Sequence, residues 1–439
     1  MNNSVDEPAV RLRRSDFATA ALAAMLAMGL SLYLSARLDP AIYGSGGFNV
    51  WFQADPPRVL RAMTDGASRY HYRTSVHPLF SLLTTPPTRA LIAMGVAPVT
   101  AGRALIAAGG FLSAGFLFLA LRGLDLPRPV AMLWIAVLLA SATYLHWFCL
   151  IETYAFGAAS ICLMLCVLTC ARATSGWLWC IASAATLSVT VTNWMLGLSA
   201  TLFRLGWRRM MYVTLAAGIA VVGLSVAQRA WYPQARYFFI PSAILNEHQY
   251  AQVHRTSGIE GWKPLTDARA MLLTSAVAPK PEVVPGDQAG GHEDEQIMTN
   301  QHSPIASYGP AGWIAGAAWA VTVVVGFAGG WGAKERRPVF LAVLTYLIGE
   351  LALNLVYGPI TFLYATNFFP ALIMLGGFGW FSRFRLVSVG AATVFVLFGA
   401  LANAASFNEA VRLANGIILG GGTHRADPAV VSQHSVTPP

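Results

Sequence analysis

Residues 103–121 read RALIAAGGFLSAGFLFLAL, with one charge at the start and only small or apolar side chains after it. A helix needs about 20 such residues to cross the hydrocarbon core of a bilayer. Similar runs recur along nearly the whole chain, so we predict an all-α polytopic membrane protein with about eleven transmembrane helices. The predicted crossings lie at 17–36, 103–121, 129–147, 153–171, 177–192, 194–207, 210–231, 309–332, 338–357, 361–381 and 386–407.

The composition agrees with a chain that lies mostly in lipid. Of 439 residues, 56% are hydrophobic and only 11% are Asp, Glu, Lys or Arg. Soluble domains carry roughly 25% charged residues. The composition therefore excludes soluble enzymes, DNA-binding modules and secreted disulfide scaffolds.

The cysteines all lie inside or beside apolar runs, which argues against a disulfide framework. Three of them, Cys162, Cys166 and Cys170, share one helix face at four-residue spacing. We interpret them as small packing residues between helices. A thiolate metal site is the alternative, although no His or carboxylate accompanies them.

The basic residues define the orientation. Lys and Arg favour cytoplasmic connections, and with eleven crossings the basic connections all fall on the same side. They hold Arg11, Arg13 and Arg14; Arg122 and Arg128; Arg172; Arg204, Arg208 and Arg209; Lys334, Arg336 and Arg337; and Arg383 and Arg385. We therefore expect a cytoplasmic N-terminus and a C-terminus outside. The net charge of +9 is then a topology signal, so it does not indicate a nucleic-acid partner.

This orientation requires residues 78–95 to be an in-plane or re-entrant helix, because counting them as a span would move Arg122 and Arg128 outside. Pro86, Pro87 and Arg89 interrupt the apolar run there. At the N-terminus, the basic residues and first apolar run also allow a signal peptide, cleaved near Ser35-Ala36.

We divide the chain by these spans. The predicted parts are a cytoplasmic tail, 1–16; a transmembrane module, 17–231, with a first outer loop at 37–102; a second outer loop, 232–308; C-terminal transmembrane helices, 309–407; and an extracytoplasmic tail, 408–439.

Polar residues of the predicted spans gather near the outer surface. Buried ionisable and amide groups at membrane depth are costly and are functional candidates by default. They are His146, Glu152, Asn193, Glu350, Asn354, Tyr357, Tyr364 and Asn367. A transport relay would place such groups through the midplane, whereas this distribution favours a reaction at the outer leaflet.

The first outer loop carries Asp55 and several arginines. A carboxylate there suits a general base toward an acceptor hydroxyl, and Arg58, Arg69 and Arg73 suit phosphate oxygens. The alternative is a solvated loop whose charges pair with one another.

Glu152 lies in an apolar stretch with no basic neighbour in sequence, so it needs a partner from elsewhere in the fold. Arg103 is a candidate partner for Glu152 or for a ligand phosphate, with snorkelling to the interface as the alternative. Asn193 belongs either to an interfacial anchor or to a ligand groove. Glu350 has either a functional, proton-coupled role or a hydrogen-bonded packing role.

The order of these motifs resembles the GT-C superfamily of membrane glycosyltransferases, which includes protein O-mannosyltransferases and lipid A aminoarabinose transferases. Asp55 and His77-Pro78 occupy the places of an acidic residue and a His-Pro element in the first outer loop. The other matching elements are Glu152-Thr153-Tyr154, Thr192-Asn193-Trp194 followed by Arg208-Arg209, and Leu363-Tyr364 with Phe369-Pro370. The resemblance covers residues 1–232 in order and 338–381 loosely. Asp55 lacks the adjacent acidic partner of metal-dependent relatives.

The resemblance implies an inverting sugar transfer from a polyprenyl-phosphate donor to a glycan, lipid or protein acceptor outside the cytoplasm. It implies Asp55 as the base and Glu152 as the second catalytic carboxylate. The donor and its phosphate are assigned to Arg58, His77, Arg103, Tyr154, Asn193 and Tyr364. No cofactor is assigned, and a divalent metal remains open. The expected location is the bacterial inner membrane, in cell-envelope synthesis.

Two other classes compete. An O-antigen-ligase-like or polymerase-like enzyme would use the second outer loop, which holds Arg236, His248, His254 and Arg255. A transporter would show similar halves and broken helices at the midplane, and neither is visible in the sequence. A catalytically inactive membrane scaffold is the remaining possibility. The sequence holds no HExxH, P-loop, GxSxG or helix-opening GxGxxG motif.

Overall fold

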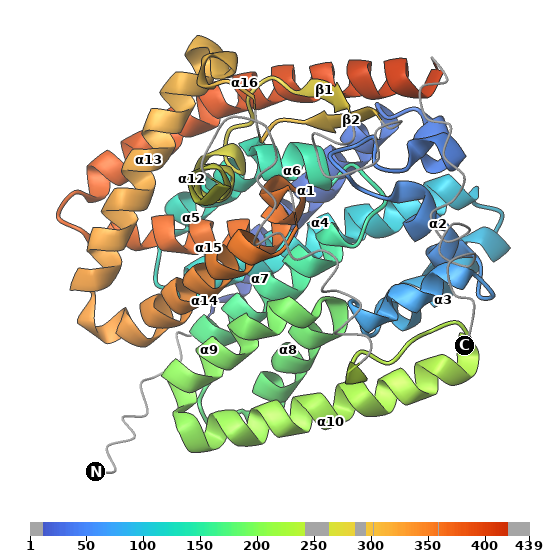
Figure 1. Cartoon of the computed structure of the whole chain (residues 1–439). Coiled ribbons are helices and arrows are strands. Elements are labelled where there is room, and N and C mark those ends of the chain that lie inside the picture. Colours follow the sequence, from blue (N-terminus) through green and yellow to red (C-terminus); the bar gives the residue numbers. More distant parts are fainter. Residues whose placement is uncertain (1–11, 242–262, 286–295, 302, 359, 420–439) are drawn as a thin grey trace.

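The computed structural model describes residues 12–241, 263–285, 296–301, 303–358 and 360–419. This part of the chain is a bundle of helices with one small strand pair (Figure 1). Seven of the described helical segments are long and apolar enough to cross a membrane. They are Arg14–Ala36, Pro98–Gly123, Trp207–Trp231, Ile305–Gly332, Lys334–Val356, Thr361–Phe381 and Arg385–Leu419. The chain is thus an all-α membrane protein.

The remaining predicted crossings are shorter helices. α5 (Arg128–Ala140), α7 (Tyr154–Cys170), α8 (Gly176–Val189) and α9 (Trp194–Leu205) have 12 to 17 residues each. At about 1.5 Å per residue, the shortest of them is well below the roughly 30 Å of a bilayer core. Eleven crossings therefore remain a prediction, with seven segments long enough on their own.

The helices approach one another closely at small residues. α4 (Pro98–Gly123) packs between α1 (Arg14–Ala36) and α7, and a methyl group on Gly109 would lie 2.9 Å from the Cβ of Ala155. α13 (Gly309–Gly332) meets α15 (Ala365–Gly377) in the same way, because a methyl on Gly326 would overlap the carbonyl oxygen of Leu375. Such contacts are typical of helices that pack inside lipid.

Basic connections lie together at one end of the bundle, which we call the basic end. Asp16, at the start of α1, pairs with Arg122 at 2.8 Å and with Arg128 at 2.7 Å. Arg336, which precedes α14 (Arg337–Val356), pairs with Asp125 at 2.8 Å. These ion pairs link the N-terminus, the α4–α5 turn and the α13–α14 turn, as the grouping of basic residues in the sequence predicts.

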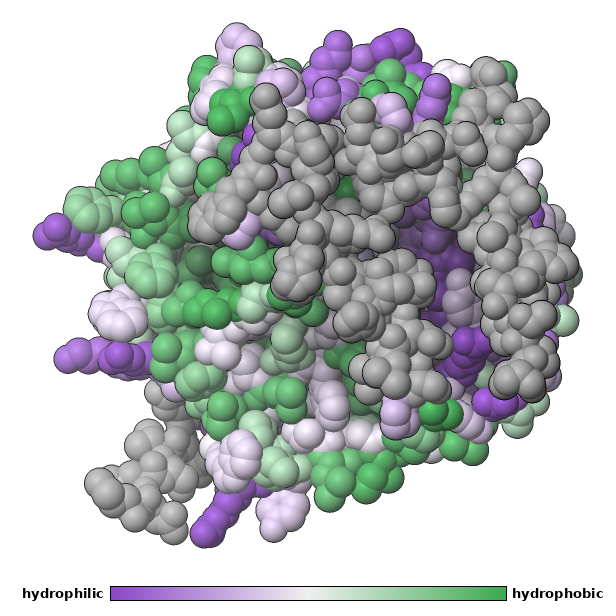
Figure 2. All heavy atoms as spheres, in the orientation of Figure 1, coloured by the Kyte–Doolittle hydropathy of each residue, from purple (hydrophilic) through white to green (hydrophobic). Residues whose placement is uncertain are grey.

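α9 packs against α14, and Met195 Sδ lies 3.3 Å from the position of a Cβ on Gly349. Figure 2 shows hydrophilic side chains at the left edge of the molecule and hydrophobic ones over the flank beside it.

One predicted crossing, 129–147, is broken. α5 ends at Ala140, and α6 (Ala142–Trp147) follows after Ser141, whose backbone is extended with ψ 154°. The N–H groups of Ala142 and Thr143 donate to the carbonyls of Ala276 and Ser275 at 2.9 Å.

Residues 270–278 therefore lie within the bundle rather than in a separate outer loop. They follow α12 (Lys263–Arg269), continue as a π-helical turn (Ala270–Thr274), and are largely buried. The side chain of Asn403 donates to the carbonyls of Ala140 and Ala276 at 2.8 Å and accepts from the N–H of Ala278. The burial of residues 270–278 is not predictable from the sequence, because their apolar run is too short for a transmembrane span.

The chain after residue 281 differs from the prediction in three places. α16 runs from Arg385 to Leu419, past the predicted end of the last crossing at 407. The strands β1 (Glu282–Pro285) and β2 (Gln296–Thr299) pair antiparallel, with Glu282 opposite Thr299. The predicted 361–381 helix is α15 flanked by 3₁₀ turns at Thr361–Tyr364 and Phe378–Phe381.

α3 (Phe80–Ala93) forms within the predicted in-plane segment. Its Ser and Thr side chains face the protein and Leu83 faces outward, the reverse of a helix in a soluble protein. Its buried side chains include Ser81, Thr84, Thr85 and Thr88, whereas Leu83 is 49% exposed. Arg89 is also exposed, so α3 has a largely apolar outer face with one charge over a polar inner face, which suits a helix that lies at the lipid surface. The side chain of Gln228 in α10 (Trp207–Trp231) fixes α3 by accepting from Leu82 N–H at 2.9 Å.

The close packing of Gly326 gives a prediction. Gly326→Ala should lower the free energy of unfolding by roughly 1–3 kcal/mol, because the added methyl overlaps backbone that has nowhere to move. Gly223→Ala on α10 is the matched control, since no atom lies within 4 Å of its new methyl. Thermal unfolding of both variants in detergent measures the difference, and equal unfolding temperatures would contradict the packing argument.

Candidate active site

The loop before Asp55 has a strained backbone. Asn49, Phe52 and Gln53 have φ values of 62°, 48° and 64°, in the left-handed region that side chains other than glycine seldom adopt. Each such residue costs roughly 1–2 kcal/mol. The loop is closed by hydrogen bonds from Asn49 N–H to the Ala54 carbonyl at 3.0 Å and from Ala54 N–H to the Trp51 carbonyl at 2.8 Å. Strain of this kind concentrates at functional sites.

An aromatic cluster holds the strained loop in place. Trp51 and Phe52 are fully buried, and Trp51 Nε1 donates to the carbonyl of His146 at 3.0 Å. The Phe52 ring lies 5.4 Å from the ring of Phe362 and 6.0 Å from that of Trp147, in edge-to-face geometry. This packing offsets the strain and fixes the position at which Asp55 enters α2 (Pro56–Thr64).

The loop that carries Glu152 is anchored independently. Residues 148–153 connect α6 to α7 without helical structure and are buried. Ser35 of α1 donates to the carbonyl of Cys149 at 2.8 Å, and Ser31 donates to that of Phe148. Their side chains satisfy backbone oxygens that would otherwise lack partners in an apolar environment.

Asp55 and Glu152 meet at the end of the bundle opposite the basic end. Glu152 Oε1 accepts from the backbone N–H of Asp55 at 2.9 Å, and its Oε2 accepts from the N–H of Thr153 at 2.9 Å. Arg58 Nε donates to Asp55 Oδ2 at 3.1 Å, and its Nη2 lies 3.9 Å from Glu152 Oε1. We call Asp55, Arg58 and Glu152 the carboxylate–arginine cluster.

The three charges in this cluster are unequally exposed. The Asp55 side chain is 29% exposed, whereas that of Glu152 is 2% exposed. Burial raises the pKa of Glu152, and the Arg58 guanidinium offsets part of that rise. Burial also disfavours the charge on Arg58, but the two carboxylates hold its pKa above the ordinary value. Both oxygens of Glu152 accept from backbone N–H groups, so this carboxylate fixes the backbone of Asp55 and Thr153.

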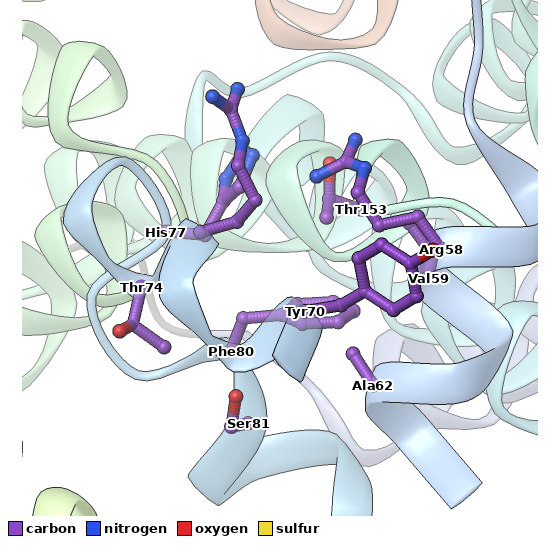
Figure 3. A pocket seen from close by; sticks show the side chains of 10 residues that line it. Arg58, Val59, Ala62, Tyr70, Thr74, His77, Phe80, Ser81 and Thr153 are labelled. Atoms are coloured by element: carbon purple, nitrogen blue, oxygen red, sulfur yellow. The ribbon is translucent and has the colours of Figure 1, made fainter. Parts of the chain in front are cut away.

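A small cavity of about 20 Å³ adjoins the cluster, enough for about one water molecule (Figure 3). Asp55 and Glu152 do not line it, but their neighbours Arg58 and Thr153 do. Its other lining residues are Val59, Ala62, Tyr70, Arg73, Thr74, His77, Phe80 and Ser81. The cavity therefore joins two arginines and His77 to the carboxylate pair.

His77 is tied to the α8–α9 turn. Its Nδ1 lies 2.9 Å from the carbonyl oxygen of Val189 and 3.3 Å from Thr190 Oγ1. Removal from solvent, together with the charges of Arg73 and Arg58, lowers the pKa of His77 to about 3. The ring is therefore neutral at physiological pH.

Two of the predicted donor residues lie close to the cluster. Tyr154 interacts electrostatically with Glu152, Arg58 and Tyr364. The ring of Tyr154 also lies 5.0 Å from that of Trp147 in the aromatic cluster. Tyr154 and Tyr364 thus extend the site toward α15.

Two other predicted donor-binding residues, Arg103 and Asn193, have contacts away from the cluster. Arg103 donates to the carbonyl of Leu38 at 2.7 Å and stacks over the Tyr43 ring at 5.6 Å; it forms no described ion pair with Glu152. Asn193 is fully buried, and its Nδ2 lies 3.4 Å from the carbonyl of Gly157, next to Asn367. Arg103 and Asn193 therefore lie outside the cavity and do not line it.

The structure adds residues to the site that sequence reasoning did not assign. Thr153 and Ser81 line the cavity, and Tyr70 supplies a ring. Arg236, from the start of the second outer loop, lies over the Tyr72 ring, with its backbone bonded to Thr74 Oγ1 at 2.7 Å. Thr153 lies between Glu152 and Tyr154 in the chain, and Arg236 is a candidate of the ligase-like alternative, whereas Tyr70 and Ser81 carry no signal in the sequence.

The cluster does not fit a divalent metal. Arg58 already holds Asp55, both Glu152 oxygens hold backbone N–H groups, and the described residues contain no group of three or more His, Cys, Asp or Glu side chains suited to a metal. His248, His254, His292 and His302 lie outside the described residues.

No family model matches the chain, and no curated protein or solved structure matches it either.

The position of Glu152 predicts a large effect of its removal. Glu152→Ala should lower the free energy of unfolding by roughly 3–5 kcal/mol, because it leaves two backbone N–H groups without their acceptor and removes one of the two carboxylates that compensate the buried charge of Arg58. Glu152→Gln should cost less, since the amide oxygen can still accept one of the N–H groups. Thermal unfolding in detergent measures both, and a neutral Glu152→Ala would show that the cluster does not hold the loop.

The neutral state of His77 predicts a pH effect. Its pKa of about 3 lies below the unfolded value of 6.5, so the unfolded chain binds the extra proton between these pH values. The stability that wild type gains over His77→Asn should therefore be largest above pH 6.5 and fall as the pH drops toward 3. Unfolding measured at several pH values tests this, and a pH-independent difference would contradict the neutral ring.

Proposed function

We propose that this protein is a GT-C-like membrane glycosyltransferase that moves a sugar from a polyprenyl-phosphate donor to an acceptor outside the cytoplasm. The supporting observation is the carboxylate–arginine cluster, in which Asp55 and Glu152 from separate loops meet beside an arginine-lined cavity. The acceptor is a glycan, lipid or protein hydroxyl. The reaction inverts the sugar, because base and leaving phosphate act from opposite sides.

Asp55 is the base in this proposal. Its carboxylate is the more exposed of the two, and it lies on a loop that strain and aromatic packing hold in one position. A general base must reach the hydroxyl proton directly or through one water. Glu152 does not take a proton; it orients Asp55 through the backbone N–H.

The departing phosphate lies between Arg58 and Arg73. Both arginines line the cavity, and charge-assisted hydrogen bonds from guanidinium groups stabilise developing charge on phosphate oxygens. The cavity of about 20 Å³ is too small for a phosphate while Arg58 is bonded to Asp55. Arg58 therefore moves toward the phosphate as the donor binds, which also releases the Asp55 carboxylate.

The lipid part of the donor lies along α3. Phe80 and Ser81 line the cavity from the inner side of this helix, while Leu83 is exposed on its outer side. Tyr154 and Tyr364 border the sugar on the side of α15, with Asn193 and Arg103 as outer supports. A chain from the bilayer then reaches the cavity without crossing a polar surface.

The membrane setting belongs to the same proposal. We place the basic end in the bacterial cytoplasm and the carboxylate–arginine cluster at the periplasmic face of the inner membrane. This setting keeps the predicted eleven crossings, a cytoplasmic N-terminus and a periplasmic C-terminus. The grouping of basic residues supports it.

The ligase-like alternative retains one supporting contact. Arg236 of the second outer loop lies beside Thr74, which lines the cavity. Its other residues, His248, His254 and Arg255, lie outside the described residues. The contact is compatible with both enzymes, because either would bring the second loop over the first.

Asp55→Asn tests the base. The variant keeps size and polarity but cannot take a proton, so transfer of radiolabelled sugar from polyprenyl-phosphate donors in membranes should fall by about 10²–10⁴-fold. Asp65→Asn in the same loop is the matched control, since Asp65 Oδ1 only accepts from Ala67 N–H. Transfer at the wild-type rate by Asp55→Asn would reject the base, and loss on His254→Ala with Asp55→Asn tolerated would favour the ligase-like enzyme.

A further inference from the structure

The hydrogen bonds of His77 define its tautomer. A backbone carbonyl only accepts, so the Nδ1 atom that faces Val189 at 2.9 Å must carry the proton. In a neutral ring, Nε2 then carries a lone pair and can only accept. No described residue donates to Nε2, although His77 lines the cavity.

The surroundings of this lone pair are positive or neutral. Arg58 on α2 and Arg73 on the 3₁₀ segment Arg69–Ser75 line the same cavity, and the Phe80 ring lies 6.3 Å from the imidazole. Thr190 contributes only its hydroxyl, at Nδ1. Burial, together with the charges of Arg73 and Arg58, keeps the pKa of His77 low, so the ring is neutral.

A neutral acceptor cannot bind a phosphate oxygen. The lone pair of Nε2 and the oxygen lone pairs repel each other, so the phosphate role expected for His77 from the sequence does not fit the ring as it is held. The arginines supply the anion contacts on their own. Nε2 requires a ligand group that donates a hydrogen, and the donor group that every sugar carries is a hydroxyl.

We propose that Nε2 of His77 accepts a hydrogen bond from a sugar hydroxyl of the substrate, next to the phosphate held by Arg58 and Arg73. This role rests on the proposed function for the identity of the ligand. His77 then determines specificity: it selects a sugar with a hydroxyl at one position and takes no proton. Sites built to bond a substrate hydroxyl discriminate strongly against the deoxy analogue.

The hydroxyl belongs either to the donor sugar or to the acceptor, and affinity separates the two. Binding of polyprenyl phosphate and of polyprenyl-phosphate sugar to purified protein in detergent is measured by tryptophan fluorescence, and the acceptor KM is taken from transfer rates. His77→Asn is the test variant, because its amide N–H can still reach the Val189 carbonyl while nothing occupies the place of Nε2. We expect the thermal stability of His77→Asn to match that of wild type at low pH, because the stability that the neutral ring adds is lost as the pH falls.

The expected result is a selective loss. His77→Asn should bind polyprenyl phosphate as wild type does, and either its affinity for the sugar-bearing lipid or its acceptor KM should worsen by about tenfold, as one lost hydrogen bond implies. The first outcome assigns the donor sugar and the second the acceptor. His77→Gln, whose amide oxygen can reach the position of Nε2, should recover part of the loss despite lacking the bond to Val189.

Two outcomes overturn the proposal. Equal weakening of both lipids would make His77 a phosphate ligand, and unchanged affinity for both lipids with an unchanged acceptor KM would remove His77 from substrate recognition. Failure of the proposed function is separate, because it appears as no transfer by wild type with any donor. In that case the two binding curves still decide whether His77 recognises a hydroxyl of the lipid-linked sugar.

Discussion

The pair of hydrogen bonds that Glu152 accepts from Asp55 and Thr153 organises the polar end of the bundle. A carboxylate at this depth is costly unless its oxygens are bonded and its charge is compensated. The backbone N–H groups supply the first requirement and Arg58 supplies the second. Because the N–H of Asp55 is one of the partners, the first outer loop cannot leave the 148–153 loop without exposing the charge. The same hydrogen bond to Asp55 helps to keep Asn49, Phe52 and Gln53 in their left-handed conformations.

The long helices were predictable because their apolar runs are longer than any soluble element needs. Asp55 and Glu152 were also identifiable, since isolated acids in apolar or aromatic surroundings have few explanations. Their meeting was not derivable, because it depends on Ser31 and Ser35 anchoring a loop more than a hundred residues away. The helix break at Ser141 was not predictable for the same reason, because the N–H groups of Ala142 and Thr143 bond to the carbonyls of residues 276 and 275. Sequence patterns report burial, whereas partner choice depends on the assembled fold.

His77 shows how far residue type alone can mislead. A histidine between arginines in a loop with a proposed phosphate site suggests an added positive charge. The carbonyl of Val189 reverses that conclusion, because it fixes the proton on Nδ1 and leaves an acceptor toward the cavity. Arg103 is a parallel case: its charge is directed to the Leu38 carbonyl and the Tyr43 ring instead of Glu152. In both residues the backbone, which no side-chain motif reveals, decides the role.

In the proposed reaction, Arg58 connects phosphate binding to the release of Asp55. Its guanidinium lies 3.1 Å from Asp55 and lines the cavity at the same time, so an anion entering the cavity competes with the carboxylate for the same donors. When the phosphate takes these donors, the Asp55 carboxylate loses its counter-ion. Glu152 keeps the backbone of Asp55 fixed during this exchange, because its bonds to the N–H groups do not involve Arg58. In the proposed reaction, one arginine shared between a carboxylate and a phosphate thus links arrival of the donor to release of the base.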